Sequence, residues 1–189
     1  MPGMHSIPVA GLLLGGTSRR MGSPKHELQL PDGRLLLEHM LDLCDAVADR
    51  TLLCGDVVPG FDRNTVPDRI QGAGPLAGIE AVLREAGSGR CLVVPCDMPA
   101  LEVEDLSRLV TTEGDIVLFE DPPGAPLQGL PMLIDANQLR NLEQFMDAGG
   151  RAIHRFIEDR AHIRVPIPMQ ERLLNINTPE DWAAYLESC

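Results

Sequence analysis

The sequence lacks two features, and each absence excludes a class of protein. Its five cysteines are odd in number and contain no C-x-x-C pair, which argues against a disulfide framework and a zinc knuckle. The early apolar run from Ile7 to Leu14 is too short to cross a membrane and carries no basic leader or cleavage site. We therefore expect a cytoplasmic protein with reduced thiols and no membrane partner.

Positive charge is also scarce. Sixteen basic residues against 28 acidic residues give a formal net charge of −12, which excludes a general nucleic-acid binder because such proteins need a basic surface. The 189 residues, 44% of them hydrophobic, suit a single domain over residues 1–189 with an adequate core. An anionic ligand must therefore be bound by a local cluster of cations.

Two common nucleotide fingerprints are missing, yet a related kind of turn is present. The segment "GGTSRRMG", residues 15–22, fits neither the G-x-G-x-x-G pattern nor the P-loop pattern. Its glycines allow close backbone approach, and Arg19, Arg20 and Lys25 add cationic donors, a combination that suits a triphosphate. The alternative is a tight strand-to-helix turn with solvated arginines.

Apolar runs alternate with segments of helical periodicity along the chain, which predicts a layered α/β fold with a parallel sheet. The predicted strands are Val9–Leu14, Thr51–Cys54, Cys91–Pro95 and Asp115–Phe119, and the predicted helices are Leu35–Val47, Leu76–Ala86, Val103–Val110, Asn137–Met146 and Ala152–Glu158. The proline-rich stretch at 120–128 predicts an irregular loop. Thr178, Pro179 and Asp181 predict the capped start of a last helix.

A carboxylate follows one of the predicted buried strands. Asp97 stands in "PCDMP", at the end of the sheet where ligands of open α/β folds collect, and it is a natural Mg²⁺ ligand. The alternative is that Asp97 caps a turn before Pro99.

Two further segments carry residues suited to ligand binding. Asp68 precedes the glycines of "GAGPLAG", residues 72–78, which open a helix whose N-terminus suits an anion or a base edge. The alternative is an ordinary loop with a glycine for close helix packing. Asn175 and Asn177 can hydrogen-bond a ligand, although Asn177 can also simply end a strand before the Thr178 cap.

Four motifs, "LLGGTSRRMGSPK", "PDRIQGAGPLAG", "PCDMP" and "NINTPED", occur in this order over residues 9–186. Together they resemble the MobA-type molybdenum cofactor guanylyltransferases, a family of nucleotidyltransferases. The resemblance implies a three-layer α/β/α Rossmann-like nucleotidyltransferase fold with a mostly parallel mixed sheet. It also implies Mg²⁺ as cofactor, GTP and molybdopterin as substrates, and a molybdoenzyme or chaperone as a possible partner.

The resemblance also assigns residues to roles. Arg19, Lys25 and Asp97 would be catalytic, with Asp97 holding the metal and Asn175 and Asn177 binding the acceptor. The implied nucleotide-binding residues are Leu13, Leu14, Gly15, Gly16, Thr17, Gly22, Lys25, Asp68, Gly74, Pro75, Leu76, Gly78 and Asp97.

Departures from the family pattern leave alternatives open. Pro24 stands where the family usually has Asp, a feature shared with related cytidylyltransferases, and Leu14 replaces a small Ala. The alternatives are a transferase that uses CTP or a sugar phosphate, and a non-catalytic nucleotide-binding protein.

Overall fold

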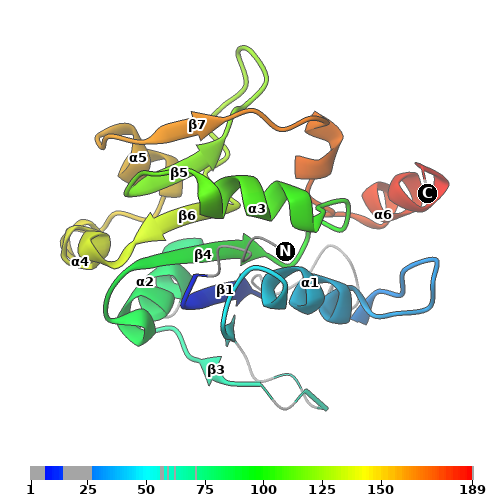
Figure 1. Cartoon of the computed structure of the whole chain (residues 1–189), viewed down its shortest axis with the longest axis horizontal. Helices are drawn as coiled ribbons and strands as arrows, with labels where there is room; N and C mark the ends of the chain where they lie inside the picture. The colour runs from blue at the N-terminus through cyan, green and yellow to red at the C-terminus, as the bar shows by residue number, and fades with distance from the viewer. Residues whose placement is uncertain are drawn as a thin grey trace.

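The described part of the chain folds into a sheet covered by helices on both faces (Figure 1). The computed structural model describes residues 7–14, 27–55, 58, 60, 61, 63–70 and 72–188. Within these residues no helix is long and apolar enough to cross a membrane. The predicted three-layer α/β/α arrangement is confirmed. That residues 1–189 form a single domain stays a prediction.

Seven strands form the sheet in the order β3-β2-β1-β4-β6-β5-β7. Their bounds are β1 Val9–Leu13, β2 Thr51–Cys54, β3 Thr65–Val66, β4 Arg90–Pro95, β5 Ile116–Phe119, β6 Met132–Asp135 and β7 Ile163–Val165. Only β6 runs against its neighbours β4 and β5, so the other six strands all point the same way. The carboxyl ends of these six strands therefore lie at one edge, which we call the carboxyl edge.

The helices divide between the two faces of the sheet (Figure 1). Their bounds are α1 Leu36–Asp45, α2 Pro75–Ala86, α3 Val103–Thr111, α4 Leu139–Asp147, α5 Ile153–Glu158 and α6 Pro179–Ser188, with short 3₁₀ turns at Ala136–Gln138 and Gln170–Leu173. Helices α1 and α3 share one apolar core with the sheet, and α2, α4 and α5 share the other.

Strand β1 shows why the sheet is buried on both sides. Ala10 and Leu12 pack into the core of α1 and α3, whereas Val9 and Leu13 pack into the core of α2. Gly11 faces α2 at very short range, because a Cβ built there would lie 2.0 Å from a methyl carbon of Val82. Any larger residue would therefore push α2 away from the sheet.

The four predicted strands and five predicted helices are all present, with ends shifted by at most two residues. The predicted cap of the last helix is also confirmed, since the backbone N–H of Asp181 donates to Thr178 Oγ1 and Asp181 Oδ2 accepts from the N–H of Thr178. Three strands were not predicted, namely β3, β6 and β7. Strands β3 and β7 have only two and three residues, too few for a pattern to be recognised, and β6 follows Pro131 and runs directly into a 3₁₀ turn.

Candidate active site

The carboxyl edge gathers the sequence motifs from distant parts of the chain. The glycine-rich segment follows β1, the segment of Asp68 follows β3, "PCDMP" follows β4 and "NINTPED" follows the stretch after β7. Because β3 and β4 end at the carboxyl edge, the segments of Asp68 and Asp97 lie there, and the hydrogen bond from the N–H of Ile176 to the carbonyl of Asp97 brings "NINTPED" beside them. That this edge is the active site stays a prediction.

The ends of β1 and β4 are joined directly. Leu13 pairs with Pro95 in the parallel register, and the N–H of Cys96 donates to the carbonyl of Leu13 at 2.9 Å. The N–H of Leu14 donates to the carbonyl of Cys54 at 3.1 Å, and the Leu14 side chain is buried in the core of α1 and α3. These backbone groups are thus already engaged, and the predicted nucleotide contacts of Leu13 and Leu14 must use their remaining groups.

The glycine-rich segment lies outside the described residues. This concerns the predicted sites Gly15, Gly16, Thr17, Arg19, Gly22 and Lys25. Their contacts with nucleotide phosphates stay predictions. The described neighbours nevertheless fix where the segment starts, because Leu14 ends at the carboxyl edge beside β2.

The predicted metal ligand and the predicted acceptor segment are hydrogen-bonded to each other. Asp97 follows β4 and is partly buried, and its backbone carbonyl accepts a hydrogen bond from the N–H of Ile176 at 2.8 Å. Ile176 lies between Asn175 and Asn177. This bond places both asparagines beside Asp97, although they are 78 and 80 positions away in sequence.

Asn175 and Asn177 differ in what they offer a ligand. The side-chain oxygen Oδ1 of Asn175 is buried and has no hydrogen-bond partner among the described residues. The backbone N–H of Asn177 donates to Asp181 Oδ2 at 2.8 Å, as part of the cap of α6. Asn175 Oδ1 is therefore an unused acceptor, whereas the backbone N–H of Asn177 serves the helix.

Asp68 and the start of α2 form the other side of the site. Asp68 lies close to Cys54 at the end of β2, and its charge adds to burial in raising the pKa of the Cys54 thiol to about 12. Gly74 precedes α2 with φ of 64°, and a Cβ there would meet nothing within 4 Å. Pro75 occupies the first helical turn, and the side chain of Leu76 is fully buried, so a ligand can reach Leu76 only through its backbone.

Gly78 serves helix packing. A Cβ at this position would lie 2.4 Å from Leu13 Cδ2 and 3.3 Å from Cys54 Cβ. Like Gly11, it allows α2 to lie close against the sheet. The surroundings of Gly78 thus agree with the alternative interpretation, a glycine needed for close helix packing. A direct contact between Gly78 and a nucleotide stays a prediction.

The loop at residues 120–131 is irregular, as predicted, and follows β5 at the carboxyl edge. Asp121 Oδ1 accepts from the backbone N–H of Gln128 at 3.0 Å, which closes the loop on itself. The Gln128 amide donates to the carbonyl of Leu173 at 3.1 Å, and the Gln170 amide donates to the carbonyl of Glu120 at 3.1 Å. These bonds tie the loop to the segment that leads into Asn175.

The carboxylate of Asp97 is the type of ligand that Mg²⁺ prefers. Mg²⁺ takes oxygen ligands and needs only one or two protein carboxylates, since phosphates and waters complete its shell. Asp97 would supply such a carboxylate from the segment that follows β4. The described residues hold no cluster of three or more His, Cys, Asp and Glu side chains that would bind a metal without a substrate.

The cysteines do not supply a nucleophile. Cys44, Cys54, Cys91 and Cys96 are buried free thiols, and burial raises the pKa of Cys91 to about 12 and that of Cys44 further still. A thiol must ionise to react, so Cys44, Cys54 and Cys91 are unreactive near neutral pH. The predicted thiols without disulfides are confirmed for the four buried cysteines, whereas Cys189 lies outside the described residues.

Sequence reasoning missed the charged residues that anchor the motif segments. Arg69, next to Asp68, pairs with buried Glu80 on α2, and Arg172, just before Asn175, pairs with buried Asp105 on α3. The signal available in the sequence was a lone acidic residue inside an apolar helical pattern, as Glu80 is in "PLAGIEAVL". The helical periodicity predicts that the Glu80 side chain faces the core, and a buried carboxylate needs a cationic partner.

The described strands bring Asp68 and Asp97 to one edge of a three-layer α/β fold, the edge at which open α/β sheets bind their ligands. The chain matches the family model of the MobA-like NTP transferase domain over residues 10–164. The protein therefore belongs to the MobA-like NTP transferase family.

Individual relatives and solved structures agree with this family. The chain is 31% identical to the probable molybdenum cofactor guanylyltransferase of Rhodopirellula baltica, covering 96% of this chain and 93% of that protein. It is 33% identical to the molybdenum cofactor guanylyltransferase of Ectopseudomonas mendocina, covering 97% and 95%. The crystal structure of molybdopterin-guanine dinucleotide biosynthesis protein A from Archaeoglobus fulgidus superimposes with a TM-score of 0.79 at 25% identity, covering 96% and 98%.

Proposed function

We propose that the protein transfers GMP from GTP to the phosphate of molybdopterin, giving the guanine dinucleotide form of the molybdenum cofactor and pyrophosphate. The observation that carries this proposal is that the segments of Asp68 and Asp97 lie at the carboxyl edge, with the backbone of Asp97 bonded to the segment of Asn175 and Asn177. The names of the relatives support guanylyl transfer. The proposed reaction takes place in the cytoplasm.

In this reaction an oxygen of the acceptor phosphate attacks the α-phosphorus of GTP. A new phosphorus–oxygen bond forms, the bond from the α-phosphorus to the bridging oxygen breaks, and pyrophosphate leaves with that electron pair. Catalysis of this kind depends on positioning and charge neutralisation, so no covalent intermediate is required. The buried, unreactive cysteines are consistent with this.

In this proposal each residue has a role that follows from its position at the carboxyl edge. Arg19 and Lys25 neutralise charge on the phosphates as pyrophosphate leaves, while Asp68 and the start of α2 hold the nucleoside. Asp97 holds Mg²⁺, which when bound supplies positive charge to the triphosphate. Asn175 accepts a hydrogen bond from the acceptor through its otherwise partnerless Oδ1.

The test is a turnover assay with GTP, Mg²⁺ and molybdopterin, measuring pyrophosphate release and formation of the dinucleotide. Lys25→Ala and Asp97→Asn are expected to lower kcat by about a hundredfold or more, since each removes charge stabilisation at the reacting phosphates. The matched control is Asp159→Asn, an exposed carboxylate just before β7 and thus at the opposite edge of the sheet. Near-normal turnover in both site variants would refute the assignment.

A second candidate is transfer of CMP from CTP. The observation that favours it is Pro24 before Lys25, the feature shared with related cytidylyltransferases. "GPLAG" at residues 74–78 favours the guanylyl branch. The two are separated by running the same assay with CTP in place of GTP. A protein that binds nucleotide without releasing pyrophosphate would instead be a non-catalytic accessory.

A further inference from the structure

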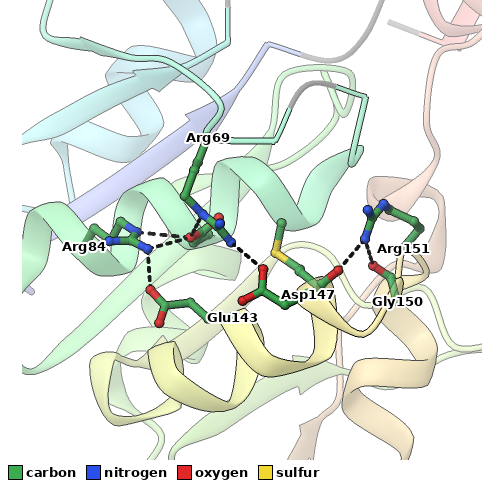
Figure 2. A network of polar contacts seen from close by, with 8 residues as sticks. Arg69, Arg84, Glu143, Asp147, Gly150 and Arg151 are labelled. Atoms are coloured by element: carbon green, nitrogen blue, oxygen red, sulfur yellow. Dashed lines mark hydrogen bonds and ion pairs between the residues drawn. The ribbon is translucent and has the colours of Figure 1, made fainter.

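A cluster of five charged side chains lies beneath the loop that carries Asp68 (Figure 2). We call it the Glu80 cluster; its members are Arg69 from the loop, Glu80 and Arg84 from α2, and Glu143 and Asp147 from α4. The side chain of Glu80 is only 1% exposed. Its Oε1 accepts from Arg69 Nε at 2.5 Å and from Arg84 Nε and Nη2 at 3.0 and 2.9 Å.

The two arginines bind the same oxygen but come from different places. Arg84 lies one turn along the same helix as Glu80, so this i,i+4 pair forms whether or not the loop is in place. Arg69 belongs to the loop at residues 67–74, between β3 and α2. Of the two, only Arg69 connects the loop to the helix.

Arg69 also reaches a second helix. Its Nη2 lies 3.3 Å from Asp147 Oδ1 at the end of α4, while Arg84 contacts Glu143 one turn earlier on α4. The earlier residue of α2, Glu80, is thus linked to the later residue of α4, and the later residue of α2 to the earlier one of α4. The two helices therefore run antiparallel along each other. Arg151 fixes the end of α4 by donating to the carbonyls of Met146 and Gly150 at 2.7 and 2.6 Å (Figure 2). Arg69 is therefore held at two points by helices that are themselves fixed.

The loop needs such an anchor. Gly72 and Gly74 both have positive φ, of 75° and 64°, so the segment contains two residues with wide conformational freedom. Arg69 Nε donates to the 1% exposed carboxylate of Glu80 at 2.5 Å, a charge-assisted hydrogen bond that ties this loop to α2. Hydrogen bonding to Glu80 accordingly raises the pKa of Arg69. Asp68 is adjacent to Arg69 in the same loop.

We propose that Arg69 is a positioning residue for nucleotide binding, which holds Asp68 and the start of α2 against the nucleoside by anchoring their loop to Glu80 and Asp147. This inference rests on the proposed nucleotidyl transfer at the carboxyl edge. It assigns to Arg69 no contact with the nucleotide itself. Its loss should therefore weaken nucleotide binding and leave the transfer step intact.

Two variants with the same charge change separate positioning from stability. Arg69→Gln and Arg84→Gln each remove one cation from the same oxygen of Glu80, but only Arg69→Gln releases the loop. We expect Arg69→Gln to raise the KM for GTP about tenfold with little change in kcat, because binding common to ground and transition states is lost. Arg84→Gln should leave the KM within about twofold of wild type, and Arg69→Lys should restore part of the binding.

Hydrogen exchange of the loop provides a readout that does not depend on the substrate. Amides within residues 67–74 should exchange faster in Arg69→Gln than in wild type and Arg84→Gln. Equal KM values for GTP, or equal loop exchange, in Arg69→Gln and Arg84→Gln would overturn the inference. If wild type uses no GTP, the proposed function fails, while the exchange comparison still decides whether Arg69 fixes the loop.

Discussion

In the described part of the chain, each face of the sheet holds one acidic residue that is fully buried, and the two are paired differently. Glu80 on α2 and Asp105 on α3 are each anchored by an arginine from a motif segment, Arg69 and Arg172 respectively. Both acidic side chains are at most 1% exposed. The two carboxylates differ in how many of their oxygens accept hydrogen bonds.

Asp105 is fully paired. Arg172 Nη1 lies 3.1 Å from Oδ1 and 3.2 Å from Oδ2, and Oδ2 also accepts from the backbone N–H of Glu102 at 3.0 Å. The Arg172 side chain is only 18% exposed, and its Nη2 contacts Glu102 at 2.8 Å. Asp105 thus joins the cap of α3 to the segment that leads to Asn175.

Glu80 is paired on one side only. Its Oε1 accepts three hydrogen bonds, while its buried Oε2 has no partner within the described part of the chain. Its arginines, Arg69 and Arg84, are 41% and 48% exposed. The difference teaches that the segment leading to Asn175 is held by a desolvated contact in which every oxygen is paired, whereas the loop of Asp68 is held by a more hydrated contact. Water can replace part of the second anchor but little of the first.

The largest effect is expected from Asp105→Asn. Both oxygens of Asp105 accept hydrogen bonds, so the amide group must face a donor, either Arg172 or the N–H of Glu102. We expect the free energy of unfolding to fall by about 3 kcal/mol, measured by urea denaturation. Glu104→Gln, exposed on the same helix, is the control. A loss equal to that of the control would show that the saturated contact contributes nothing.

A smaller effect is expected from Glu80→Gln. The amide oxygen can replace Oε1, and the amide nitrogen can take the place of Oε2, where no donor stands. The free energy of unfolding should fall by about 1 kcal/mol in the same urea titration. Glu85→Gln, exposed on α2, is the matched control. If Glu80→Gln cost more than Asp105→Asn, the contrast between the two anchors would be reversed.

The smallest effect concerns pH and the α1 side of the sheet. Burial lowers the pKa of His39 on α1, with Arg34 acting the same way, while the Pro99 carbonyl, Asp32 and Asp42 oppose the shift. The folded protein therefore disfavours the proton that unfolded His39 takes up below about pH 6.5, so this stability is present above that pH and declines as the pH falls.

The measurement is the melting temperature at about pH 7.5 and about pH 5.5. His39→Gln should lose less stability on acidification than wild type, whereas His154→Gln, exposed on α5, should behave as wild type does. Identical pH dependence in all three proteins would show that His39 is not buried in its neutral form.

The sequence was most informative where a pattern is local. The run Val9–Leu14 and the spacing of "LLLEHMLDLCDAV" predict a strand and a helix because burial repeats within a few residues. The Thr178 cap was predictable for the same reason, since its partner Asp181 is three positions away. The short strand β6 was not, because its four residues lie between Pro131 and a 3₁₀ turn and carry no periodicity of their own.

The anchors of the site were not predictable because they depend on distant partners. Arg69 and Asp147 are 78 positions apart, and Arg172 and Asp105 are 67 positions apart. Burial of Glu80 follows from its apolar neighbours, but which cation meets it depends on how α2 and α4 pack. Motif spacing located Asp97 and Asn175, whereas only the fold connects them through Ile176.

The measurement that tests the central claim most directly is calorimetric titration of the purified protein with GTP, CTP, ATP and UTP, each with Mg²⁺, repeated on Lys25→Ala. The account predicts selective binding of GTP that is lost in the variant. Preference for CTP would contradict the guanylyl assignment and favour cytidylyl transfer, and binding of none of the four nucleotides would contradict a nucleotide site at the carboxyl edge.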